Sequence, residues 1–192
     1  MLPSRLTRAA ACALAAATLG ALAGCGSHEG EEEVRREGLA LPLGGVSYEV
    51  VLTRQINPRD VEDMGYLRTD LQTPGPPPGR TYYGVFLQAC NLTDEPQRTA
   101  STFRIVDTAG NEIEPADLEE TNPFAYQPTL IEPADCLPRE GSLAEAGPAS
   151  ASLLLFEVPI EVTENRPLEL EILGGFSLEE GAPEELTIEL DL

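Results

Sequence analysis

Apolar and polar residues alternate along several stretches of the chain after residue 45. In the first stretch every second residue is apolar: Val46, Tyr48, Val50 and Leu52. A period of two places these side chains on one face of an extended strand, so the pattern predicts a half-buried strand that ends by Asn57 and Pro58. The same alternation returns at residues 168–172 and 186–190, and both stretches are predicted strands.

Residues 82–89 are instead apolar or aromatic at nearly every position, which is typical of a central strand buried on both faces. Residues 152–159 form a second strongly apolar stretch, also predicted to be a strand. Between them, residues 103–106 and 112–114 flank a turn in which Gly110 supplies a positive φ angle. This arrangement predicts a β-hairpin.

Prolines mark the remaining segments as loops. Residues 74–78 contain four prolines and predict an extended loop, while one helical turn is expected within residues 59–79. Six prolines between residues 115 and 149 exclude a long helix there, although residues 129–131 are predicted to form a short edge strand. Gly174-Gly175 is predicted to turn the chain before the last strand.

Short strands at this spacing, with little helix, predict an all-β domain folded as an antiparallel β-sandwich over residues 39–192. A chain of this length is expected to bury one substantial core rather than two. The candidate core residues are Tyr48, Tyr83, Val85, Leu87, Phe103, Ile105, Leu154 and Phe156.

The first 25 residues have the layout of an export signal. Arg5 and Arg8 give it a positive start, residues 9–22 are almost wholly apolar, and small residues precede Cys25. The apolar run is shorter than the ~20 residues that a membrane-spanning helix needs. Residues 22–25, Leu-Ala-Gly-Cys, resemble the lipobox of bacterial lipoproteins, which implies removal of residues 1–24 and a thioether between Cys25 and diacylglycerol.

This resemblance implies a lipid anchor in the cell membrane, with the protein on the extracytoplasmic face. Two or three acyl chains hold a protein stably where one chain is marginal. The alternative is an ordinary cleaved signal with a coincidental cysteine. Residues 25–38 include Glu31-Glu32-Glu33 and have no apolar periodicity, so they are expected to form a flexible acidic tether.

The chain is strongly acidic. It has 33 Asp and Glu residues against 12 basic residues and a formal net charge of −21, and lysine is absent. Loss of Arg5 and Arg8 with the signal makes the mature protein more negative still. Such a surface repels phosphate backbones over a Debye length of ~8 Å, so nucleic acid is not an expected partner.

Cysteine usage is consistent with export. Cys12 lies in the signal and Cys25 is assigned to lipid, which leaves Cys90 and Cys136 as a candidate disulfide outside the reducing cytoplasm. Two separate free thiols or a metal site are the alternatives. The metal site lacks a third soft ligand nearby, so we expect the disulfide.

Three segments resemble one known domain family. They are the strand end at Cys90-Asn91, residues 102–107 (Thr-Phe-Arg-Ile-Val-Asp), and residues 153–159 (Leu-Leu-Leu-Phe-Glu-Val-Pro). Together they resemble the telokin-like, immunoglobulin-related domain of bacterial lipoproteins of unknown function, over roughly residues 44–192. The resemblance implies an immunoglobulin-like sandwich outside the cytoplasm and brings no catalytic residues. The insert after Asn57 and the loop around Cys136 depart from the family pattern.

The residue types of nucleophilic catalysis are scarce. The only histidine is His28, in the predicted tether, so a Ser or Cys nucleophile would lack its usual base. The same shortage argues against zinc or copper sites built on imidazole, and no cofactor is expected. A pair of carboxylates acting on a glycan is disfavoured because the chain has no tryptophan and few aromatic rings.

Calcium is the one metal for which the sequence offers ligands. Asp60, Glu62 and Asp63 cluster in one loop, and three further carboxylates cluster in another, at Asp117, Glu119 and Glu120. Carboxylate oxygens suit Ca²⁺, but neither cluster has the spacing of a known calcium loop. Solvated surface charge is therefore the favoured interpretation, with Asp60, Glu62 and Asp63 as weak candidates.

The expected function is a non-enzymatic interaction or accessory module of the cell envelope. An envelope protein is the expected partner, contacting the loops at residues 58–80 and 115–148. Two alternatives stay open: a cation- or solute-binding lipoprotein, and a carboxylate-dependent hydrolase that acts on envelope glycans.

Overall fold

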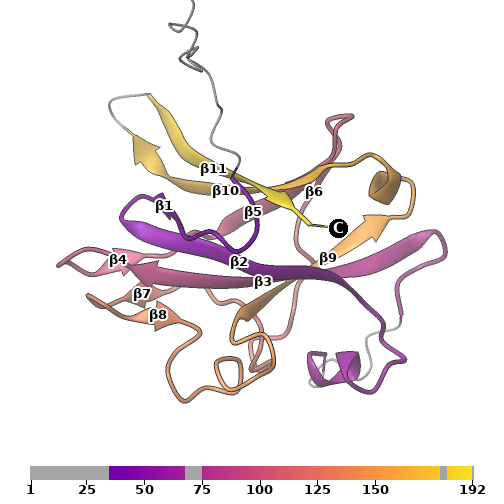
Figure 1. Ribbon diagram of the computed structural model, residues 1–192, viewed down its shortest axis with the longest axis horizontal. Coiled ribbons are helices and arrows are strands. Elements are labelled where there is room, and N and C mark those ends of the chain that lie inside the picture. The colour runs from indigo at the N-terminus through magenta and orange to yellow at the C-terminus, as the bar shows by residue number, and fades with distance from the viewer. Residues whose placement is uncertain (1–34, 68–74, 178–180, 192) are drawn as a thin grey trace, which may run out of the picture. The chain divides into compact units, whose positions relative to one another are not determined.

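The computed structural model describes residues 35–67, 75–177 and 181–191 (Figure 1). The chain divides into two compact units, Met1–Glu33 and Val34–Leu192, and only the second unit contains described residues. These residues form antiparallel β-strands and two single turns of 3-10 helix, η1 (Asp63–Gly65) and η3 (Val162–Glu164). The prediction of an all-β antiparallel fold is confirmed.

The first sheet is built around the two longest strands. Its strands are β1 (Leu41–Leu43), β2 (Val46–Ile56), β3 (Arg80–Asn91), β8 (Cys136–Leu137) and β9 (Ser152–Pro159). They follow the order β1-β2-β3, and β8 and β9 both pair with the other edge of β3. Gly44 and Gly45, with φ angles of 57° and 82°, make the two-residue turn between β1 and β2, which only residues tolerant of positive φ allow.

The second sheet has the order β11-β10-β5-β6. Its strands are β5 (Thr102–Val106), β6 (Glu112–Ile113), β10 (Leu168–Ser177) and β11 (Ala182–Leu190), and a separate short pair joins β4 (Gln97–Arg98) to β7 (Leu130–Ile131). The predicted hairpin is therefore β5–β6, and the predicted edge strand is β7. Both predictions are confirmed.

The prediction that Gly174-Gly175 turns the chain is wrong. β10 continues through both glycines to Ser177, with an irregular register between Leu173 and Phe176. A Cβ atom at Gly174 would lie 3.1 Å from Cγ of Leu43, so the missing side chain lets β10 pass close to β1. A glycine pair inside a strand here marks a bulge and a close approach rather than a turn.

The main core lies between the two sheets. All eight predicted core residues are buried in one cluster of apolar side chains, together with leucines and isoleucines of β10 and β11. Two tyrosine hydroxyls of this core hold the backbone of one residue, Ala100: Tyr48 accepts a hydrogen bond from its amide (2.6 Å), and Tyr126 donates one to its carbonyl oxygen (2.9 Å). Burial raises the pKa of both tyrosines above the usual value.

A second apolar cluster covers the outer face of the first sheet. Ile56, Phe86 and Leu153 contribute to it from β2, β3 and β9, and Tyr66 packs on them from the loop around η1, its ring centroid 4.9 Å from that of Phe86. The ring centroid of Phe124, in the proline-rich segment, lies 5.1 Å from that of Tyr66. This explains why residues 82–89 are apolar on both faces. Parts of both loops that we predicted to recognise partners serve to cover this sheet.

Residues 35–38 belong to the sandwich rather than to the expected flexible tether. Arg36 forms a parallel bridge with Glu189 of β11, and the amide of Gly38 donates to the carbonyl of Val50 (2.8 Å). The Glu37 carboxylate accepts hydrogen bonds from backbone amides on both sides. The predicted domain boundary at residue 39 therefore lies too far along the chain.

Candidate functional site

A β-bulge in β2 changes which side chains this strand turns toward the core. The pairing register with β3 shifts between Val50 and Leu52, so that Thr53 pairs with Val85 and Gln55 with Tyr83. Val50, Val85 and Tyr83 all belong to the cluster between the sheets. After the bulge, the inward positions of β2 are therefore polar, at the end of the strand where the groove described next begins.

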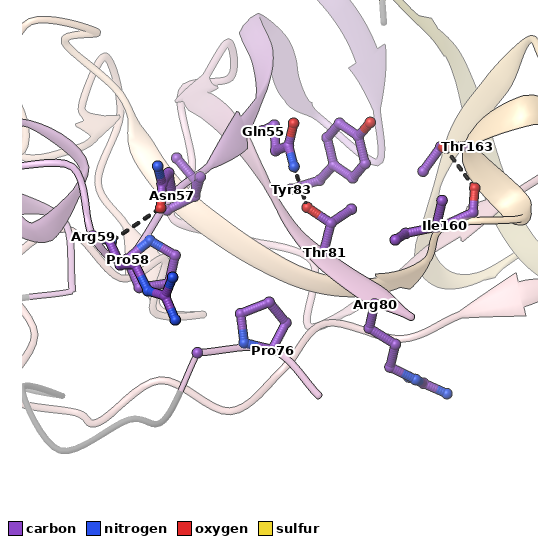
Figure 2. Close-up of a pocket in the computed structure, with 12 residues that line it drawn as sticks. Gln55, Asn57, Pro58, Arg59, Pro76, Arg80, Thr81, Tyr83, Ile160 and Thr163 are labelled. Carbon is purple, nitrogen blue, oxygen red and sulfur yellow. Dashed lines mark hydrogen bonds between the residues drawn. The ribbon is translucent and has the colours of Figure 1, made fainter. Parts of the chain in front are cut away.

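A groove of about 780 Å³ lies over this polar end of β2 and β3 (Figure 2). Gln55, Ile56, Thr81 and Tyr83 come from the paired strands, and residues 57–59 follow the end of β2. Ile160 lies just before η3 and Thr163 lies within it, and Gly75, Pro76 and Arg80 complete the lining. No residue of the second sheet lines this groove.

Hydrogen bonds hold several lining groups in place. The side-chain amide of Gln55 donates to the hydroxyl of Thr81 across the strand pair. The hydroxyl of Thr163 donates to the carbonyl oxygen of Ile160 (2.6 Å), and the side-chain carbonyl of Asn57 accepts from the backbone amide of Arg59 (3.0 Å). These contacts hold the side chains of Gln55, Asn57 and Thr163 in position without a ligand.

The two arginines at the groove differ in their surroundings. Arg80 donates to the carboxylate and the carbonyl oxygen of Glu157, at 3.1 and 3.3 Å, and its guanidinium extends away from the other lining side chains in Figure 2. Arg59 has no carboxylate partner in the part of the chain that the structure describes. One positive charge is thus free at the groove.

The structure does not bring the calcium candidates together. Asp63 is buried, pairs with Arg54 and accepts a hydrogen bond from the amide of Asn57 (2.8 Å). Asp60 accepts from the amide of Glu62 (2.9 Å) within its own turn. Within the described ranges, no three His, Cys, Asp or Glu side chains are grouped so that they could hold a metal ion. The second carboxylate loop, at 117–120, likewise supplies no such group.

The predicted disulfide between Cys90 and Cys136 is confirmed. It joins directly opposed residues of β3 and β8, and it ties the proline-rich segment to the first sheet. Cys25, the lipidation candidate, and His28 lie outside the described residues. In the described part, no helix is long and apolar enough to cross a membrane.

The alternation of apolar and polar residues did not predict the groove, although the sequence contains one signal for it. Tyr83 is a predicted core residue and is only 7% exposed, yet it also lines the groove. Gln55 and Thr81 are not among the predicted core or site residues. Polar side chains at inward positions near the end of two long strands indicate a face that the opposite sheet does not cover.

Comparisons with known proteins show a similarity of fold only. No model of a protein family matches it, and no curated protein matches it. Among solved structures it is similar to the yjhA protein from Bacillus subtilis, with a TM-score of 0.50 and 10% identity, over 82% of this chain and 100% of that one. An uncharacterized β-sandwich protein from Clostridium difficile 630 has a TM-score of 0.42 and 12% identity, over 84% and 99% of the two chains.

Proposed function

We propose that this protein is a lipid-anchored binding module on the extracytoplasmic face of a bacterial cell membrane and that it is not an enzyme. The observation that carries the location is the disulfide between Cys90 and Cys136. Disulfides form and persist in oxidising compartments, so this bond supports the export signal that residues 1–25 resemble. The telokin-like, immunoglobulin-related family of lipoproteins is the proposed relationship, and the antiparallel sandwich supports it.

Binding is favoured over catalysis by the residue types at the groove. None of the 12 lining residues that the structure describes is a histidine, a cysteine or a carboxylate. General acid–base and nucleophilic catalysis usually rely on these side chains, held within hydrogen-bond reach of each other. The groove offers amides, hydroxyls and one free guanidinium, which suit recognition of a solute. Solute binding is therefore favoured over the cation-binding alternative, because the free charge is positive.

Fatty-acid labelling tests the anchor. Cells that express the wild-type protein, Cys25→Ser or Cys12→Ser are grown with an alkyne fatty acid, and the purified chains are assayed for the label. The wild type and Cys12→Ser should carry it, whereas Cys25→Ser should not. The label is a better readout than membrane fractionation alone, since an uncleaved apolar signal would also hold the precursor at the membrane. Label on Cys25→Ser, or none on the wild type, would refute the anchor.

A thiol assay tests the compartment separately. Protein taken from cells under alkylating conditions should show Cys90 and Cys136 protected until a reductant is added. Alkylation of both residues without reductant would remove the main support for the extracytoplasmic location.

A further inference from the structure

The groove differs in charge from the rest of the molecule. The chain has 33 acidic residues, yet none of those in the described ranges 35–67, 75–177 and 181–191 lines the groove. Two of the acidic residues that follow Arg59 interact with other groups: Asp60 accepts a hydrogen bond from the amide of Glu62, and Asp63 pairs with Arg54. The Arg59 guanidinium is therefore the charged group that an incoming ligand meets, and it favours a ligand with one negative charge.

The uncharged lining groups leave both donors and acceptors for a ligand. Gln55 donates to Thr81 and keeps its side-chain oxygen as an acceptor, while Asn57 accepts from Arg59 and keeps its NH₂ group as a donor. The Tyr83 hydroxyl, at a residue that lines the groove, has no hydrogen-bond partner among the described residues. Because hydroxyl groups both donate and accept, a ligand with several hydroxyls matches this mixed set of groups.

Apolar side chains form part of the wall. Ile160 is 50% exposed, and Pro58 and Pro76 also line the groove. Such side chains can contact the C–H face of a saturated ring, although no exposed aromatic ring is present in the lining for stacking. The volume, about 780 Å³, falls within the range of roughly 300–1,000 Å³ found for small-molecule sites.

We propose that this groove binds a sugar acid, that is, a hydroxyl-rich solute carrying one carboxylate. The carboxylate pairs with the guanidinium of Arg59, and the ring hydroxyls hydrogen-bond to Gln55, Asn57 and Tyr83. Ile160 contacts the apolar face of the ring. This inference rests on the proposed role as a binding module and adds the class of ligand to it.

Calorimetric titration of the full-length lipoprotein in detergent tests the inference. The probes are galacturonate, its uncharged methyl ester, galactose and galactose 6-phosphate. Galacturonate should bind about fivefold more tightly than the ester or galactose, which is the effect of one partly exposed ion pair. Tighter binding of the 6-phosphate than of galacturonate would overturn the carboxylate assignment, and equal binding of galacturonate and its ester would do the same.

Three variants locate the site. Arg59→Gln should remove the preference for galacturonate and leave galactose binding unchanged, whereas Ile160→Ser should weaken both about equally. Arg98→Gln, which removes an exposed arginine of β4 outside the lining, should behave as the wild type. A preference that survives Arg59→Gln, or no binding of any saccharide, overturns the inference. Failure of the anchor would appear in the fatty-acid labelling and not in these titrations.

Discussion

The side-chain amide of Asn165 donates a hydrogen bond of 2.9 Å to Oδ2 of Asp107 and joins two loops that are 58 residues apart in sequence. Asp107 begins the turn between β5 and β6, and Asn165 follows η3. The other carboxylate oxygen, Oδ1, accepts from the amides of Ala109 (2.9 Å) and Asn111 (2.8 Å). Burial alone would raise the pKa of Asp107, but the hydrogen bonds from Asn111, Asn165 and the backbone outweigh it and lower the pKa to about 2.

This carboxylate should make stability depend on pH in a defined window. Its pKa is lower in the folded state than the value of about 3.9 for an unfolded chain, so it stabilises the fold above about pH 4. That contribution is lost as the pH falls from about 4 toward 2. In Asp107→Asn an NH₂ group would face the donors, so the variant should be less stable than the wild type near neutral pH.

Urea denaturation at a series of pH values between 6 and 2, on the order of one unit apart, measures this effect. The difference in unfolding free energy between the wild type and Asp107→Asn should shrink below about pH 4. Asp94→Asn, at an exposed turn position, is the matched control and should follow the wild type throughout. A constant difference between the wild type and Asp107→Asn would contradict the assignment.

Gly84 should not tolerate a side chain. It lies in β3 between β2 and β9, and a Cβ atom there would be 2.9 Å from Cδ1 of Leu153 and 3.0 Å from Cγ1 of Ile56. Gly84→Ala should therefore cost about 1–3 kcal/mol of unfolding free energy through overpacking. Gly175→Ala is the control, because a Cβ atom at that strand position meets nothing within 4 Å. Equal midpoints for the two variants in urea would show that the core near Gly84 adapts freely.

The disulfide should contribute strongly to the stability of the sandwich. Cys90 and Cys136 are 46 residues apart, and the chain-entropy model gives about 4 kcal/mol for closing a loop of that length. The double variant Cys90→Ser, Cys136→Ser should lose about that amount in urea denaturation. Wild-type protein treated with a reductant should match the double variant, which separates loss of the bond from damage by the serines. A double variant as stable as the oxidised wild type would contradict this prediction.

The strands and the core were predictable from sequence because burial leaves a local pattern. Leu154 and Phe156 alternate in β9 with residues of the opposite face, and both lie in the core between the sheets. The two-residue strands β4 and β8 leave no such pattern, since pairing with a distant segment defines them. The bulge after Val50 also leaves no pattern in the sequence. It decides whether Gln55 faces the second sheet or the outer face of the first sheet. The groove depends on that bulge, so alternation alone did not predict it.

Tertiary contacts also override local composition at the start of the domain. Residues 35–38 follow an acidic run and have no periodicity, which led to their assignment as tether. Hydrogen bonds to β2 and β11 nevertheless order them, because β11 is an edge strand with unpaired backbone groups. No feature of the short segment itself indicates that the partner strand is available.

Glu37 should act as a clamp between the two sheets. Its Oε2 atom accepts from the amide of Thr53 in β2 (3.1 Å), and its Oε1 atom accepts from the amide of Asp191, just after β11 (3.0 Å). Glu37→Ala leaves two backbone amides to water and should cost about 1–2 kcal/mol, since hydrogen bonds to a charged acceptor are among the stronger ones.

Two further variants distinguish this clamp from a general effect of charge. Glu37→Gln keeps one acceptor oxygen but presents an NH₂ group to the second amide, so its unfolding free energy should fall between those of Glu37→Ala and the wild type. Glu132→Ala removes an exposed glutamate elsewhere and should leave stability unchanged, or raise it slightly by lowering the net negative charge. Hydrogen exchange at the amides of Thr53 and Asp191 should accelerate in Glu37→Ala. Unchanged exchange at both amides would mean that the carboxylate does not hold them in solution.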